Sequence, residues 1–238
     1  MTAFFLTMRS TACLLLALAL PFSAHAARPF ITDDARVTTE RSCQLESWMR
    51  IYPQSKEAWA LPACNLTGNL EITMGGGHAH YDAATSTVDY VFQAKTLFRE
   101  LKTNDWGIGF AAGKVMHPAV NPGPNLLGNT YAYVPVTFSL LDDRAFVHLN
   151  GGWLKDRATQ RNNATWGIGG EYWMTPRVSV LAENFGDNRA KPYWQTGFRT
   201  FVVPDRVQVD ATMGNQYGAT RDGRWFSIGI RLTPDSLF

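Results

Sequence analysis

The sequence predicts a single all-β domain, an antiparallel up-and-down transmembrane β-barrel of about twelve strands. Three observations lead to this fold class. The chain opens with an export signal. No later segment reaches the ~20 apolar residues that a transmembrane helix needs. Apolar and polar residues alternate with a period of two along the remaining length, as in strands with one apolar and one polar face.

The predicted export signal occupies residues 1–26. Arg9 precedes an apolar run at 12–22, and Ala24-His25-Ala26 offers the small side chains that signal peptidase accepts. The apolar run is too short to span a bilayer, so we expect a cleaved peptide rather than an anchor helix. The mature chain then begins at Ala27, and the barrel occupies 27–238 with a short periplasmic segment at its N-terminus.

The strands follow as segments of about ten residues with alternating hydrophobicity, separated by turn residues. We predict them at 43–52, 57–64, 68–77, 87–99, 105–116, 130–140, 144–154, 164–174, 177–186, 192–203, 206–214 and 224–233. Bacterial outer-membrane barrels have an even number of strands, and the count agrees.

The connectors alternate in length. Tight ones at 141–143, 175–176 and 204–205 contrast with longer ones at 117–129, 155–163, 186–191 and 215–223. Short turns at one end and long loops at the other are typical of an outer-membrane barrel. We therefore expect the long connectors outside the cell and the tight ones in the periplasm.

The faces of each strand follow from the same alternation. In 224–233, Phe226, Ile228 and Ile230 share one face, while Ser227 and Arg231 share the other. A lipid-facing Arg or Lys near the bilayer midplane costs ~2–4 kcal/mol, so the charged face belongs inside. Applied to every strand, this parity places in the lumen Glu46, Arg50, Glu71, Asp89, Lys95, Glu171, Glu183, Arg199, Asp210 and Arg231.

Aromatic side chains divide between the lumen and the membrane interfaces. The parity turns inward Trp48, Tyr131, Tyr133, Phe146, Trp173 and Phe201. Such a lumen suits small amphipathic or aromatic solutes; alternatively, its residues pack and neutralise one another in a plugged, structural barrel. Interfacial girdles account for Trp106, Trp166, Tyr172, Trp194 and Trp225.

No catalytic, cofactor or metal site is expected. The net charge of +2 does not favour nucleic acid as a partner. His78 and His80 could share a metal on one strand face, but no third ligand stands at a recognisable spacing, and we interpret them as a loop pair. Inward His148 could serve a nucleophile such as Ser179 or Ser227, although no catalytic motif marks such a cluster.

Five segments resemble a known outer-membrane family. They are Arg-Pro-Phe-Ile-Thr-Asp-Asp-Ala at 28–35 with Gln-Leu-Glu at 44–46, and the strand segments 93–99, 203–210 and 224–232. They are similar to the outer-membrane family associated with the meta-pathway of phenol degradation. The resemblance spans nearly the whole mature chain and implies an outer-membrane barrel with a transport role. It carries over no site residues.

We therefore expect a passive channel for small, aromatic or weakly polar molecules in the outer membrane of a Gram-negative bacterium. Its expected partners are outer-membrane lipid, the assembly machinery that recognises a terminal aromatic such as Phe238, and the solute. The alternatives are a membrane-embedded lipid-modifying enzyme, a plugged structural barrel and a soluble periplasmic barrel.

The two cysteines of the mature chain, Cys43 and Cys64, are predicted to form a disulfide. If strands 43–52 and 57–64 pair about a turn at 52–55, Ile51 lies opposite Lys56, and position 43 falls opposite position 64. The bridge would secure the first hairpin near its periplasmic end.

Overall fold

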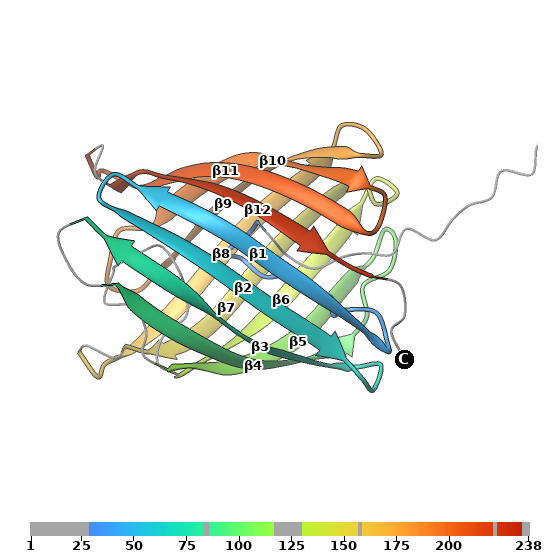
Figure 1. Ribbon diagram of the computed structural model, residues 1–238. Coiled ribbons are helices and arrows are strands. Elements are labelled where there is room, and N and C mark those ends of the chain that lie inside the picture. The colour runs from blue at the N-terminus through green and yellow to red at the C-terminus, as the bar shows by residue number, and fades with distance from the viewer. Residues whose placement is uncertain (1–28, 83–85, 117–129, 157–158, 221–222, 235–238) are drawn as a thin grey trace, which may run out of the picture.

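The computed structural model describes residues 29–82, 86–116, 130–156, 159–220 and 223–234, and forms a closed barrel of twelve antiparallel strands (Figure 1). The strands are β1 (Ser42–Tyr52), β2 (Ser55–Asn65), β3 (Leu70–Tyr81), β4 (Thr87–Arg99), β5 (Trp106–Met116), β6 (Thr130–Leu140), β7 (Ala145–Lys155), β8 (Asn162–Trp173), β9 (Val178–Asp187), β10 (Tyr193–Val203), β11 (Val207–Gln216) and β12 (Trp225–Leu232). Each strand pairs with its neighbours in the chain, and β12 pairs with β1 to close the ring. Within the described residues, no helix has the length and apolar character to cross a bilayer.

All twelve predicted strands are present, and one boundary differs instructively. The third strand was predicted to end at Gly77, but β3 continues to Tyr81. The glycines do not interrupt the ladder, because Gly76 pairs with Tyr90 and Gly77 with Asp89. The indole of Trp59 lies over Gly77, where a Cβ would collide with the ring. Glycine is thus required at position 77 because Trp59 of the neighbouring strand β2 occupies the space of its side chain, and not because the chain turns there.

The two faces of the wall follow the predicted alternation. In β12, Ser227 and Arg231 are each 1% exposed, whereas Ile228 between them is 48% exposed. The other strands repeat this contrast, with apolar side chains on the outer face. A wall that is apolar outside and charged inside matches a barrel whose solvent is hydrocarbon.

The connectors define two different ends. At the turn end, the connections 66–69, 100–105, 141–144, 174–177 and 204–206 are short, and β1 begins and β12 finishes there. At the loop end, the connections 53–54 and 188–192 are described in full, and 82–86, 156–161 and 217–224 are described in part. The longest connection in the sequence, 117–129, lies outside the described residues.

Cations stacked on aromatic rings mark the turn end. The guanidinium of Arg99 lies 4.2 Å from the ring centre of Trp106, and that of Arg144 lies 5.6 Å from the ring centre of Tyr172. Arg99 also pairs with Asp105 at 2.5 Å. The backbone N–H of Trp106 and the Arg99 side chain together hold the pKa of Asp105 below its ordinary value.

One ring does not belong to a girdle. Trp225 was predicted to lie at the membrane interface, but it is 3% exposed and shares the inward face of β12 with Ser227. Its ring covers inward-facing Gly214 on β11 and lies 6.2 Å from the ring of Tyr193. The prediction was wrong because it did not apply to Trp225 the alternation that already turned Ser227 and Arg231 of the same strand inward.

Candidate functional site

The barrel interior contains a segment of the chain that precedes β1. Residues 29–38, here named the strap, lie within the ring of strands, and most of their side chains are buried (Figure 1). The contacts described below join the strap to β9 and β10 on one wall and to β3 and β4 on the other. In a ring of twelve, β4 and β10 are opposite each other. The strap therefore crosses the lumen.

The first part of the strap is bound by β9 and β10. The carboxylate of Glu183 accepts the backbone N–H groups of Ile31 at 2.7 Å and Thr32 at 2.8 Å. The side-chain amide of Gln195 donates to the carbonyl of Pro29 at 2.9 Å and also to Glu183. A carboxylate that receives two backbone donors and an amide is well satisfied without a cationic partner.

The centre of the strap carries two acidic side chains against one lysine. Lys95 of β4 lies 2.7 Å from the carboxylate of Asp33 and 3.6 Å from that of Asp34. Tyr133 of β6 donates its hydroxyl to Asp33 at 2.7 Å. With its amide oriented so that both ends have partners, Asn150 of β7 bonds to the backbone of Asp33 at 2.7 and 2.8 Å. Three strands thus converge on Asp33.

Further along, the strap contacts β6 and β7. The backbone N–H of Ala35 donates to the hydroxyl of Thr137 at 2.9 Å, and this hydroxyl lies 3.0 Å from Nδ1 of His148. The guanidinium of Arg36 lies 4.3 Å from the ring centre of Phe146. His148 therefore supports the strap through Thr137, and it is buried at 2% exposure rather than placed at the lipid face.

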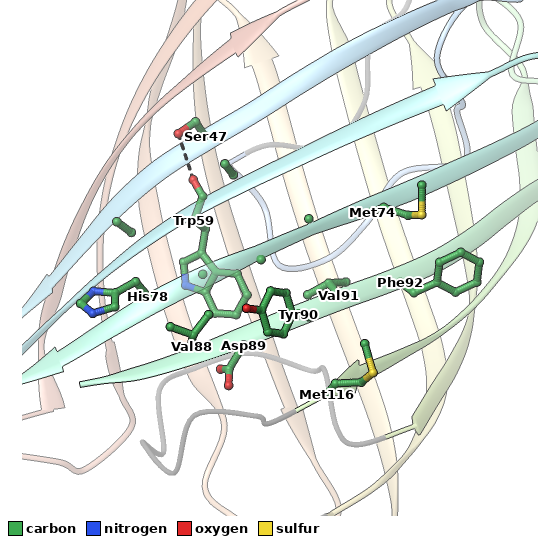
Figure 2. A pocket seen from close by; sticks show the side chains of 15 residues that line it. Ser47, Trp59, Met74, His78, Val88, Asp89, Tyr90, Val91, Phe92 and Met116 are labelled. Carbon is green, nitrogen blue, oxygen red and sulfur yellow. Dashed lines mark hydrogen bonds between the residues drawn. The ribbon is translucent and has the colours of Figure 1, made fainter. Parts of the chain in front are cut away.

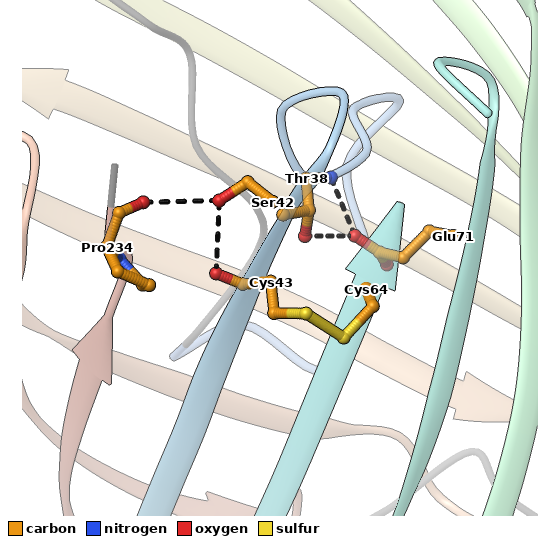
Figure 3. Close-up of a disulfide and its surroundings, with 6 residues drawn as sticks. All are labelled: Thr38, Ser42, Cys43, Cys64, Glu71 and Pro234. Atoms are coloured by element: carbon orange, nitrogen blue, oxygen red, sulfur yellow. Dashed lines mark hydrogen bonds between the residues drawn. A yellow bond between two sulfur atoms is a disulfide. The ribbon is translucent and has the colours of Figure 1, made fainter. Parts of the chain in front are cut away.

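The end of the strap is secured beside the disulfide (Figure 3). Thr38 donates its N–H and its hydroxyl to Glu71 of β3, at 2.7 and 2.6 Å. Cys43 and Cys64 are bonded with their Cα atoms 4.0 Å apart, which confirms the predicted pairing and its register. Because Cys43 follows the strap so closely, the bridge fixes the point from which the strap enters the lumen.

Two inward glycines make room for the strap. A Cβ built on Gly167 of β8 would lie 3.2 Å from Cβ of Thr32, and one built on Gly169 would lie 2.9 Å from the ring of Phe30. Any larger residue at either position would push the strap from the wall.

The opposing charges of the wall also meet. Arg199 of β10 pairs with Glu171 of β8 at 3.0 Å, and Ser179 donates to the same carboxylate at 2.6 Å. In the ladder, Arg199 is opposite Asp210, and Glu46 is opposite Arg231. These pairings explain how carboxylates are tolerated inside strands that are otherwise apolar.

Inward rings form stacked pairs on the lumen wall, between adjacent strands, across an intervening strand or within one strand. The ring centres of Trp48 and Trp59 are 5.8 Å apart, and those of Trp173 and Phe201 are 5.3 Å apart. Tyr131 and Tyr133, both on β6, stack at 6.2 Å. The lumen wall thus offers flat apolar surfaces between its charged groups.

The structure places every predicted lumen residue on the inward face of its strand. Six of them touch the strap or lie directly beside its contacts: Glu71, Lys95, Glu183, Arg199, Tyr133 and Phe146. The remaining ones belong to the wall, its ion pairs and its stacked rings: Glu46, Arg50, Asp89, Glu171, Asp210, Arg231, Trp48, Tyr131, Trp173 and Phe201. Their role in a solute path stays a prediction.

The strap itself was not predicted. The N-terminal segment was predicted to lie in the periplasm, whereas residues 29–38 lie against inward side chains of β3, β4, β6, β7, β9 and β10. The inward pair Gly167 and Gly169 was the available signal, because two side chains are missing where the lumen has to be filled. The predicted signal peptide, residues 1–26, lies outside the described residues.

The histidine pair considered as a metal site lies elsewhere. His78 and His80 are exposed on the outer face of β3, with Ala79 between them facing inward. Among the described residues, no group of three or more His, Cys, Asp or Glu side chains could hold a metal ion.

Solved outer-membrane channels share this architecture. The KdgM porin matches with a TM-score of 0.60 at 8% identity, over 79% of this chain and 98% of that one. The NanC porin matches with a TM-score of 0.54 at 10% identity, over 80% and 98%. The COG4313 outer membrane channel from Pseudomonas putida F1 matches with a TM-score of 0.54 at 13% identity, over 87% and 100%. At these identities the likeness concerns the fold.

No curated protein matches the sequence. One protein family does, over residues 14–233, which is most of the chain. The chain thus belongs to the family described as uncharacterised conserved protein UCP029691.

Proposed function

We propose that the protein is a passive channel for small solutes in the outer membrane, and that the strap closes its lumen in the present conformation. The observation that carries this proposal is the way in which the strap is bound. Most of its contacts are hydrogen bonds and ion pairs to opposite walls, of which the pair between Lys95 and Asp33 is the shortest ion pair. Water can replace such contacts when the strap leaves, whereas it cannot replace an apolar core.

The proposal gives the barrel an orientation. Outer-membrane barrels have their short turns in the periplasm, so the loop end is the extracellular mouth. The strap then enters from the periplasmic side, beside the disulfide. Export, membrane insertion by the assembly machinery and cleavage of the signal peptide belong to this proposal.

The interior argues for uncharged or weakly polar solutes. Among the described residues, seven carboxyl side chains are buried against five cationic ones. An excess of carboxylates repels polyanions, such as the oligogalacturonate with which the KdgM porin was solved. The stacked inward rings suit aromatic solutes, as does the resemblance to the family associated with phenol degradation.

No observation favours the lipid-modifying enzyme. A catalytic group acting on lipid has to reach the outer face, and among the described histidines the one inside the barrel, His148, is buried beneath the strap. We assign no catalytic role and no cofactor.

Planar-bilayer recording tests the proposal. A variant lacking residues 29–38 should conduct in larger and longer events than the wild type. A control variant with the same ten residues in scrambled order should behave like the deletion, because it lacks the specific contacts. Liposome swelling should then show faster entry of neutral and aromatic solutes than of anionic sugars. If the deletion variant is folded, as judged by heat-modifiable gel mobility, and still passes no ions or solutes, the barrel is structural.

A further inference from the structure

A groove lies on the outer wall of the barrel, on the face opposite to the lumen (Figure 2). Its floor consists of small residues from three strands, because Ser47 of β1 pairs with Ala60 of β2, which in turn pairs with Gly76 of β3. Larger apolar residues of β3, β4 and β5 stand around this floor: Met74, Val88, Tyr90, Phe92 and Met116. The groove is open on its outer side, and its volume is about 850 Å³.

The groove opens toward hydrocarbon. The side chains around it are among the most exposed apolar residues of the wall, with Met74 at 60% and Tyr90 at 53%. On a membrane barrel such side chains face lipid tails. A hollow of this kind lets an acyl chain approach the backbone more closely than the surrounding convex wall does, since the side chains of the floor are small.

Three basic side chains lie at the loop end of the groove. His78 is part of its lining, and Lys56 and His80 are Cα partners one step further toward the loops. All three are exposed on the outer face, and Nδ1 of His80 lies 3.1 Å from the hydroxyl of Ser86. This end of the groove therefore combines a lysine and two imidazoles above an apolar hollow.

We propose that this groove is a binding site for lipid A, the phosphate-bearing glycolipid of the outer leaflet, with an acyl chain in the hollow and a phosphate at Lys56 and His80. The basic side chains at the loop end favour a lipid with an anionic headgroup above its acyl chain, and lipid A has such a headgroup. The basic end of the groove lies at the loop end, which is extracellular in the proposed orientation, so the site faces the outer leaflet. The site does not depend on whether the lumen conducts.

Native mass spectrometry of the purified, folded protein with added lipid A tests the site. The wild type should retain one lipid A molecule in preference to phosphatidylglycerol. Replacing Lys56 and His80 together by glutamine should weaken retention by about fivefold or more, because a lysine near a membrane surface contributes an attraction of that order. Ala60→Leu, which fills the exposed floor, should weaken it independently of charge.

Two variants serve as matched controls. Ala182→Leu makes the same change at an exposed outer position of β9, and Lys155→Gln removes an outer cation at the loop end of β7. Both should retain lipid A like the wild type. Equal retention by all variants, equal retention of phosphatidylglycerol, or the absence of any bound lipid in the wild type would overturn the proposal. Heat-modifiable gel mobility shows that each variant is folded.

Discussion

Thr32 of the strap packs directly on Gly167 of β8, in the space that a side chain at position 167 would occupy. The two residues are 135 positions apart in the sequence, yet a Cβ on Gly167 would lie only 3.2 Å from Cβ of Thr32. Disulfides have Cβ atoms about 3.5–4.5 Å apart, so a small shift of the strap allows a bridge at this place.

We predict that the double variant Thr32→Cys with Gly167→Cys locks the strap in the lumen. Conductance in planar bilayers should fall to the baseline under oxidising conditions and return when a reductant is added. Each single variant, and the wild type with reductant, control for the bulk of the cysteines and for reduction of the native bridge. Wild-type conductance in the oxidised double variant would show that solutes pass without movement of the strap.

Replacing Lys95 by methionine should release the strap. If the strap stayed in place, Asp33 and Asp34 would be buried without Lys95 as their cationic partner. Removing one partner of a buried ion pair costs about 3–5 kcal/mol. The measurement is limited trypsin digestion, because Arg36 is 7% exposed in the closed barrel and becomes accessible when the strap leaves. Lys114→Met, at an exposed outer position of β5, should leave the strap protected. Equal protection in both variants would mean that Lys95 does not hold the strap.

Removing the disulfide by Cys43→Ala with Cys64→Ala should lower the free energy of unfolding by about 3 kcal/mol, as expected for a closed loop of this size. Urea titration in lipid bilayers, followed by tryptophan fluorescence, measures the change. The wild type with and without reductant provides the comparison. A loss below about 1 kcal/mol would show that the hairpin of β1 and β2 is held by its ladder alone.

An arginine on the outer face should have a cost that depends on its depth. Ile228 lies in the middle of β12 and is 48% exposed, so Ile228→Arg should destabilise the barrel by about 2–4 kcal/mol in a bilayer. Leu232 ends the strand at the turn end, and Leu232→Arg should cost about 0–1 kcal/mol. Equal costs at the two positions would be inconsistent with a barrel that spans the membrane through this wall.

The strands were predictable because the outer face of each one has to be apolar to face lipid, which produces a regular alternation in the sequence. Glu171 and Arg231 lie in apolar segments, and each shares its face of the strand with small or polar residues. This alternation indicates a strand with one polar, inward face. The register of β1 and β2 was predictable for a local reason, because Pro53 marks a short turn and places Cys43 opposite Cys64.

The strap was not predictable in the same way. It has no alternation, and its partners are remote: Ile31 bonds to Glu183, 152 residues away, and Ala35 to Thr137, 102 residues away. Local patterns do not report contacts that only the closed ring creates. Trp225 was misplaced for a different reason, since the alternation of its own strand turns it inward with Ser227 and Arg231.

The disulfide at the base of the strap also limits where a released strap can go. Ten residues span at most about 35 Å, so residues 29–38 stay near the mouth of the barrel even when they are free. The strap is then a tethered ligand of its own lumen, present at an effective concentration in the millimolar range. Weak individual contacts suffice for closure under these conditions, and a separate peptide of residues 29–38 should block the deletion variant only when it is added at millimolar concentrations.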